Sequence, residues 1–144
     1  MPSSKKHALR IVLDTNVWVS ALIWGGKPAT IIEAAEQGKI DIFISEFIVE
    51  EISQVLSYPK IEKVYHTQLT RQQLMEQILK NTKIVEITTK LEAIKEHPAD
   101  DKIIECAASA KADYIISGDK HLLNVSSYQK TPILPVSDFI KLIE

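Results

Sequence analysis

Short apolar runs alternate with segments of helical periodicity along all 144 residues, and no other feature of the sequence limits the possible folds so strongly. The runs have the length of strands, and the segments between them place apolar residues on one helical face. This alternation is typical of βαβ units. Short strands that are apolar throughout belong in a mostly parallel sheet with helices on both faces. We therefore predict an α/β fold with a mostly parallel sheet of about four to five strands.

The expected elements follow from capping residues and from the period of the apolar residues. Strands are predicted at residues 9–13, 41–44, 83–87, 114–117 and near 133–134. Helices are predicted at 15–24, from a turn at 25–28 to near 38, at 45–57, in a short segment from 59, at 70–81, at about 101–111 and as one turn at 120–123. Ser45 and Thr70 are expected to cap the helices that they begin.

Length and composition fit a single domain over residues 1–144, with residues 1–8 expected to be disordered. The net charge of -2 comes from 17 basic and 19 acidic side chains, which excludes a strongly basic nucleic-acid binder. The sole cysteine, Cys106, cannot form an internal disulfide and suits a reducing cytoplasm. No signal peptide and no apolar run of membrane-spanning length is recognisable. We therefore predict a soluble cytoplasmic protein.

Two aspartates follow predicted strands, and each admits two interpretations. Asp14 ends the first strand, and Asp119 follows the fourth in the segment YIISGD. If the sheet reverses its winding between those strands, both carboxylates lie in the crevice at the switch point, where open α/β sheets bind ligands. The alternative is that each aspartate only caps the helix that follows it.

The helix predicted at 45–57 carries two adjacent glutamates that a helical wheel separates. Glu50 falls on the polar side, whereas Glu51 falls inside the apolar arc between Phe47 and Val55. An ionised carboxylate on a core-facing surface is costly unless a partner or a metal compensates it. Glu51 is therefore a candidate functional acid, and the alternative is a salt-bridged acid at the rim of the apolar stripe.

Two further acids, Asp100 and Asp101, begin the alanine-rich helix. Asp100 is well placed as its N-cap, and Asp101 then lies at the edge of the apolar face, but the wheel does not decide which of them matters. The alternative is that both simply stabilise the helix N-terminus. Cys106 and the alanines that follow it are expected to pack against the sheet.

Carboxylates on strand ends and helix faces, without a histidine pair at metal-ligand spacing, indicate a hard divalent cation bound by oxygen atoms. The expected ion is Mg²⁺ or Mn²⁺. With scattered histidines and one cysteine, a structural zinc site is not expected. No nucleophile elbow, dinucleotide-binding glycine pattern or P-loop occurs.

Four segments, in their order and spacing, resemble the PIN domain family, in particular the toxins of toxin–antitoxin pairs related to VapC-like ribonucleases. The segments are IVLDTNVWVSAL, FIVEEISQVL, DDKIIECAASAKADYIISGDKHLL and TPILPVSDFIKLI. The resemblance covers the chain from about Leu9 to its end. It implies that the family's first acid is Asp14, its helix glutamate Glu51, and its fourth acid Asp119, which follows the small hydroxyl residue Ser117.

The resemblance also bears on the residues beside these acids. The usual separation of the third and fourth acids matches Asp101 and Asp119, which leaves Asp100 as the helix cap. Asn16 falls on a polar position that often supports the metal shell, and its alternative role is to help cap the first helix. Gly118 stands where many members carry a larger residue.

The resemblance implies a three-layer α/β/α fold and cleavage of single-stranded RNA with one or two divalent ions. Lys102, Lys120 and His121 lie beside the acids in the sequence and are candidates to hold flanking phosphates; the alternative is a solvated surface. A cognate antitoxin protein and a homodimer are the expected protein partners. No membrane is expected to be involved.

Two other functions start from the same fold. One is a non-catalytic PIN-like module that binds RNA or protein, although all four acids are present. The other is an aspartyl-phosphate enzyme of the haloacid dehalogenase type or a receiver domain, since both place an aspartate at a strand end. A haloacid dehalogenase-type enzyme would need a second aspartate at position 16, where Asn16 stands. A receiver domain would need its acceptor aspartate after the third strand, where the segment KIVEITT has none.

Overall fold

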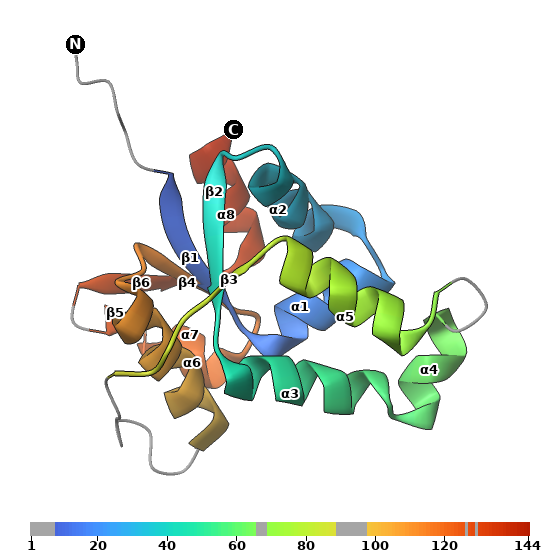
Figure 1. The fold of residues 1–144 in the computed structure, drawn as a ribbon. Helices are drawn as coiled ribbons and strands as arrows, with labels where there is room; N and C mark the ends of the chain where they lie inside the picture. The colour runs from blue at the N-terminus through green and yellow to red at the C-terminus, as the bar shows by residue number, and fades with distance from the viewer. Residues whose placement is uncertain (1–7, 66–68, 89–97, 126, 129) are drawn as a thin grey trace.

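A computed structural model of the protein describes residues 8–65, 69–88, 98–125, 127–128 and 130–144 (Figure 1). Apart from Ala8, the N-terminal segment for which the sequence predicts disorder lies outside the described residues. No helix in the described part of the chain is long and apolar enough to cross a membrane.

The described residues form a six-stranded sheet with the strand order β3-β2-β1-β4-β6-β5. Its strands are β1 (Leu9–Leu13), β2 (Ile40–Ile44), β3 (Lys83–Ile84), β4 (Tyr114–Ile116), β5 (Ser127–Tyr128) and β6 (Thr131–Leu134). Neighbouring strands are parallel except for β5 and β6, which are antiparallel. The predicted mostly parallel sheet is confirmed, and the short β5, which is not among the predicted strands, makes it one strand larger than expected.

The winding of the sheet reverses at β1. Strands β2 and β3 lie on one side of β1, and β4 and β6 lie on the other. The carboxyl ends of β1 and β4 therefore flank a topological switch point, where open α/β sheets bind ligands. The pairing extends to Asp14, whose N–H donates to the carbonyl of Ile116 at 3.0 Å. The condition under which Asp14 and Asp119 face one crevice is met.

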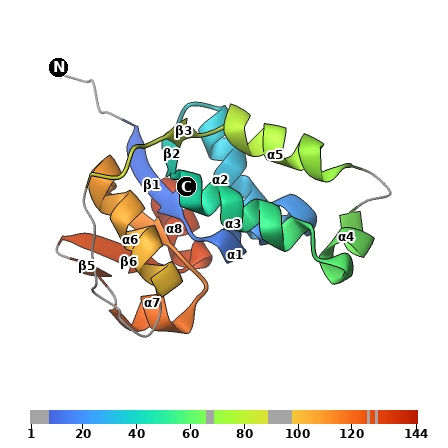
Figure 2. The ribbon, with the colours of Figure 1, turned by 60° about the horizontal axis from the view of Figure 1, so that its bottom comes forward.

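The described helices cover the sheet in the three-layer arrangement (Figures 1 and 2). They are α1 (Thr15–Ile23), α2 (Gly26–Glu36), α3 (Glu46–Leu56), α4 (Pro59–Tyr65), α5 (Arg71–Lys80), α6 (Pro98–Ala110), α7 (Lys120–Val125) and α8 (Val136–Ile143). Helix α6 contacts β1, β2 and β4 on one face, while α2 packs against α1, α8 and β2 on the other. Helix α3 extends away from the end of β2 and contacts α1, α6, α5 and α4.

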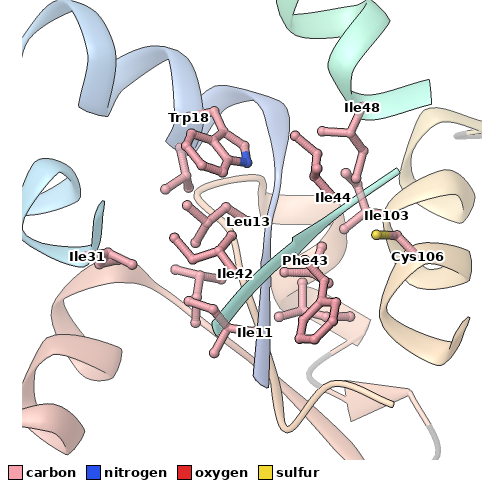
Figure 3. Close-up of a cluster of buried hydrophobic side chains, with 14 of the residues drawn as sticks. Ile11, Leu13, Trp18, Ile31, Ile42, Phe43, Ile44, Ile48, Ile103 and Cys106 are labelled. Atoms are coloured by element: carbon pink, nitrogen blue, oxygen red, sulfur yellow. The ribbon is translucent and has the colours of Figure 1, made fainter. Parts of the chain in front are cut away.

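The core lies on both faces of the central strands. Figure 3 shows Trp18 and Ile31, from α1 and α2, on one side of β1 and β2, and Ile103 and Cys106, from α6, on the other. Because successive strand residues point to opposite faces, both of which are covered, these strands are apolar except for Arg10 and Asp41. Burial raises the pKa of the Cys106 thiol to about 12, so Cys106 is a packing residue as the sequence predicts.

Arg10 holds the C-terminal end of α6 on the sheet. Its guanidinium lies 4.3 Å from the centroid of the Phe43 ring and donates two hydrogen bonds, of 2.9 and 2.6 Å, to the carbonyl of Ala110. Its backbone N–H donates to the carboxylate of Asp113 at 2.8 Å. These contacts leave the N-terminal end of α6 on the side of the sheet where Asp14 and Asp119 lie.

The predicted caps of two helices are confirmed. The hydroxyl of Ser45 accepts the N–H of Ile48 at 3.3 Å and so caps α3. The hydroxyl of Thr70 accepts the N–H of Gln73 at 3.2 Å, and the Gln73 side chain accepts the Thr70 N–H at 2.8 Å, which completes a capping box at α5.

Three expectations about the elements are wrong. Strand β3 ends at Ile84 instead of residue 87, although the N–H of Val85 still donates to the carbonyl of Ile44 at 2.9 Å. Helix α6 begins at Pro98 and not near residue 101, because proline fits the first turn of a helix, where N–H groups have no partner within the helix. Helix α8 is not among the predicted helices, although Phe139 is buried at its centre.

Candidate active site

A pocket of about 250 Å³ lies at the carboxyl ends of the central strands. It is lined from the start of α1, from α3 and the residues just after it, from the first turns of α6 and from the loop after β4. The lining residues are Asp14, Thr15, Asn16, Glu51, Gln54, Val55, Tyr58, Asp100, Ile103 and Asp119. The pocket therefore gathers four carboxylates from parts of the sequence that are far apart.

Asp14 directly follows strand β1 and lines this pocket. The residue is 5% exposed, and both of its carboxylate oxygens accept hydrogen bonds. Oδ1 accepts the N–H of Val17 at 2.9 Å and so caps α1, and Oδ2 accepts the hydroxyl of Ser117. The two interpretations of Asp14 are thus compatible, because one residue caps the helix and lines the pocket.

Ser117 lies between the two strand-end acids. It is fully buried just after β4, donates to Asp14 and accepts the N–H of Asp119 at 2.9 Å. The Oδ1 atom of Asp119 in turn accepts the N–H of His121 at 2.7 Å, at the start of α7. A single hydroxyl therefore couples the loop after β4 to the end of β1.

The surroundings of Asp14 raise the pKa of its carboxyl group. Burial raises the pKa of its carboxyl above the ordinary value of 3.8, and the negative charge of Asp119 raises it further. Hydrogen bonds from Ser117 and from the backbone of Val17 and Gly118 oppose this rise. The charged form is therefore disfavoured here, and a bound cation would reverse that preference.

Helix α3 contributes Glu51, as the wheel predicts. Glu51 is half-buried and lines the pocket, whereas its neighbour Glu50 is exposed to solvent. The hydroxyl of Thr15 donates to the Oε1 atom of Glu51. Because Thr15 directly follows Asp14, this contact ties the side chain from α3 to the end of β1.

Helix α6 brings Asp100 to the pocket, and Asp101 is not among the lining residues. Both are buried, at 8% and 6% exposure, so burial alone does not distinguish them. The expectation that Asp100 caps a helix starting at Asp101 is wrong, because the helix starts at Pro98 and both aspartates lie in its first turn. With this earlier start, Asp100 lines the pocket together with Asp14, Glu51 and Asp119.

The remaining candidate residues fall into two groups. Asn16 is exposed and lines the pocket, whereas Lys102, Lys120 and His121 do not line it. The ammonium of Lys102 lies 3.4 Å from the carboxylate of Glu105 on the same helix. Lys120 and His121 are exposed at the start of α7. Contact of these three residues with substrate phosphates stays a prediction.

The chemistry of the lining fits a divalent cation. Within the described ranges, no three Asp, Glu, His or Cys side chains lie close enough together to hold a metal ion as they stand. Four carboxylates nevertheless line one pocket, and hard cations such as Mg²⁺ and Mn²⁺ prefer such oxygen donors. The hydroxyls of Thr15 and Ser117 orient two of these carboxylates, in the way that groups around a metal site orient its ligands.

Several lining residues escape the sequence reasoning. Thr15 and Tyr58 are not among the predicted site residues, the helical wheel places Gln54 on the polar side of its helix and Val55 in the apolar arc, and Tyr58 falls between two predicted helices. A signal was present for two of them, because Gln54 and Val55 follow Glu51 at the i+3 and i+4 spacing that places residues on one helical face.

Comparisons with known proteins agree with this architecture. The profile of the PIN domain matches residues 10–121. The uncharacterized protein MJ1680 of Methanocaldococcus jannaschii is 29% identical over 131 residues, which cover 90% of this chain and 83% of that protein. The crystal structure of VapBC2 from Rickettsia felis, bound to a DNA fragment from their promoter, matches with a TM-score of 0.63 at 17% identity, covering 88% of this chain and 98% of that chain.

The last of these likenesses concerns the fold alone, because the identity is low. The family match is more informative, since it spans most of the chain and includes both strand-end aspartates, Glu51 and the first turn of α6. This protein belongs to the PIN domain family.

Proposed function

We propose that this protein is a divalent-metal-dependent nuclease that hydrolyses phosphodiester bonds in single-stranded RNA. The observation that carries the proposal is the convergence of Asp14, Glu51, Asp100 and Asp119 on one pocket at the switch point of the sheet. The hydroxyls of Thr15 and Ser117 donate to carboxylates of the site, and the thiol of Cys106 is buried in the core, so none of these three groups is presented as a free nucleophile.

The four pocket carboxylates would hold Mg²⁺ or Mn²⁺. When bound, such an ion would supply an activated water near neutral pH and would offset the negative charge that develops on the scissile phosphate and the leaving oxygen. It also offsets the repulsion between an acidic pocket and a polyanionic substrate. A protein with a net charge of -2 can therefore bind RNA without a basic surface.

The chain's own side chains orient these acids. Ser117 holds Asp14 through Oδ2 and fixes the backbone of Asp119. Thr15 donates to Oε1 of Glu51, so that Oε2 of Glu51 is the atom proposed to accept a proton from the attacking water. Asn16, at the pocket lip, is proposed to support the ion through a water molecule.

For the third acid of the family we propose Asp100 in place of Asp101. The spacing to Asp119 suggested Asp101, but Asp100 is the one of the two that lines the pocket. Asp101 is then a first-turn acid that stabilises the N-terminal end of α6.

The test of the nuclease is incubation of an end-labelled single-stranded RNA with the purified protein and Mg²⁺ or Mn²⁺. Cleavage is expected with either ion and is expected to stop after addition of EDTA. Asp14→Asn should remove cleavage while the fold is kept, because asparagine caps a helix as well as aspartate does. Cleavage in EDTA, or an unchanged rate in Asp14→Asn, would contradict the proposal. A folded wild type that binds RNA without cutting it would favour the non-catalytic module.

We further propose that the nuclease is the toxin of a toxin–antitoxin pair. The resemblance to VapC-like ribonucleases and the structural likeness to VapBC2 support this role. Expression of the wild type should arrest growth, and co-expression of a small protein encoded next to it should restore growth and co-purify with a dimer of this chain. If wild type and Asp14→Asn affect growth equally, the toxin role is wrong.

A further inference from the structure

Part of the pocket lining is not acidic. Gln54, Val55 and Tyr58 line it from α3 and the residue pair that follows α3, and Ile103 lines it from α6. Ile103 is buried and Val55 is half-buried, but the Tyr58 side chain is 48% exposed. A large aromatic residue thus borders a polar pocket and remains open to solvent.

The spacing along the chain joins this part of the lining to the acids. Glu51, Gln54 and Val55 stand at positions i, i+3 and i+4 of α3 and so share one face of that helix, and Tyr58, two residues after its end, lines the same pocket. At about 1.5 Å per residue, the end of α3 at Leu56 lies roughly 7–8 Å along the helix axis from Glu51, and Tyr58 follows two residues later. The distance from a backbone phosphate to a neighbouring base of an extended strand is of the same order.

The backbone at Tyr58 is held firmly. Its N–H donates to the carbonyl of Val55 at 3.1 Å, and its carbonyl accepts the N–H groups of Ile61 and Glu62 at 2.9 and 2.8 Å. The hydroxyl of the buried Tyr65, at the end of α4, donates to the carbonyl of Leu56 and so closes the corner between the two helices. A side chain carried on such a corner can bind a ligand with little loss of backbone entropy.

We propose that Tyr58 and Gln54 form a nucleobase subsite next to the acidic end of the pocket. This proposal rests on the proposed nuclease function. The Tyr58 ring stacks on one base of a single-stranded RNA, and the Gln54 amide, which can donate and accept, meets the edge of that base. Stacking on aromatic side chains is how proteins hold unpaired bases, and it tolerates different bases because every base has a planar face. With the base held there, the adjoining phosphate lies at the four carboxylates.

The experiment compares two RNAs and three variants. The cleavage position in a labelled single-stranded RNA is mapped first, and a second RNA carries abasic riboses on both sides of that position. Tyr58→Ala should lower kcat/KM on the intact RNA about 5- to 150-fold, which is the usual contribution of one stacked base. Tyr58→Phe keeps the ring and should stay near the wild type. Trp24→Ala is the matched control, because Trp24 is 70% exposed and is not a pocket residue.

The abasic RNA separates stacking from a general effect on the fold. Wild type should cut the abasic RNA about as slowly as Tyr58→Ala cuts the intact RNA, and Tyr58→Ala should lose nothing further on it. An equal loss on both RNAs, or no loss on either, overturns the subsite. So does a Tyr58→Ala protein that keeps wild-type kinetics and loses its oligomeric state, which would make Tyr58 a protein contact.

A binding measurement keeps this proposal apart from the nuclease proposal. Fluorescence anisotropy of the intact RNA with Ca²⁺ in place of Mg²⁺ should show weaker binding for Tyr58→Ala and unchanged binding for Tyr58→Phe and Trp24→Ala. If no protein cleaves RNA but this order of affinities is found, the nuclease proposal fails and the base subsite stands. If wild type and Tyr58→Ala bind equally, or if neither binds, the base subsite is wrong.

Discussion

The pocket acids come from two kinds of support, and the two are held very differently. Asp14 and Asp119 follow parallel strands, and their positions are fixed by backbone hydrogen bonds and by the hydroxyl of Ser117. Glu51 and Asp100 project from α3 and α6, so their positions depend on how those helices pack. For Glu51 the structure adds one side-chain contact, the hydrogen bond from Thr15.

This difference assigns different roles to the two pairs. A strand end next to a paired strand has little freedom to move, so the strand-borne acids form a fixed frame at the switch point. The helix-borne acids can approach or leave that frame by rotation of a side chain. We therefore expect the strand-borne pair to define where an ion binds, and the helix-borne pair to complete its coordination.

The sharpest test of this comparison concerns the neighbouring aspartates of α6. Asp100→Asn should lower the single-turnover cleavage rate by at least about a hundredfold, since even groups that only support metal ligands contribute about 10- to 100-fold. Asp101→Asn should stay within about threefold of the wild type, because first-turn acids contribute only modestly, to helix stability. The opposite order would return the third position to Asp101.

A similar pair on α3 tests the other helix-borne acid. Glu51→Gln should slow cleavage about a hundredfold, since the amide can neither bind a cation as a carboxylate does nor accept a proton. Glu50→Gln is the matched control and should change little, because Glu50 is exposed and does not line the pocket. Equal effects in the two variants would show that the placement of Glu51 has no functional meaning.

The same division explains how much of the site could be predicted from the sequence. Strand ends are easy to locate, because an apolar run that stops at a polar residue marks the carboxyl end of a buried strand. Asp14 and Asp119 were therefore placed correctly at the switch point, and the position of Glu51 followed from the broad apolar arc of its helix.

Other parts of the site depended on details that a pattern does not fix. On a helix, a shift of one residue turns a side chain by about 100°, so Asp100 and Asp101 could be exchanged by a small error in the start of α6. Pro98 was the signal that the helix begins earlier. The Thr15–Glu51 hydrogen bond joins residues 36 apart in sequence, and no local pattern reveals such a contact.

The link between the strand-borne acids can be weakened by Ser117→Ala. This change removes the hydroxyl that donates to Asp14 and accepts from the N–H of Asp119, and it should lower kcat/KM about tenfold, at the lower end for groups that support metal ligands. The loss should be larger than that of a matched change at Ser137, which is exposed on α8 and does not line the pocket.

The pH dependence of this variant gives a second readout. The Ser117 hydrogen bond lowers the pKa of Asp14 and so opposes the effect of burial. Its removal should raise the pKa further, and because a metal binds the ionised carboxylate, the acidic limb of the pH–rate profile should move to higher pH. A slower variant with an unmoved acidic limb would mean that Ser117 acts only on the backbone of Asp119.

The smallest expected effect concerns the metal-free fold. Because burial raises the pKa of Asp14 above 3.8, the folded protein binds a proton more readily than the unfolded chain does, and its stability falls as pH rises through the raised pKa. Asp14→Asn removes this penalty while it keeps a good N-cap, so in EDTA at neutral pH it should stabilise the fold by about 1 kcal/mol. For a chain of this size that corresponds to a rise in Tm of roughly 2–5 °C.

Mg²⁺ should raise the Tm of the wild type more than that of the Asp14→Asn variant, since an ion that binds only the native state stabilises it by mass action. Thermal melts at neutral and mildly acidic pH, with EDTA or Mg²⁺, measure both effects. If Asp14→Asn melts lower in EDTA and Mg²⁺ shifts both proteins equally, Asp14 is a helix cap alone and the strand-borne frame binds no ion.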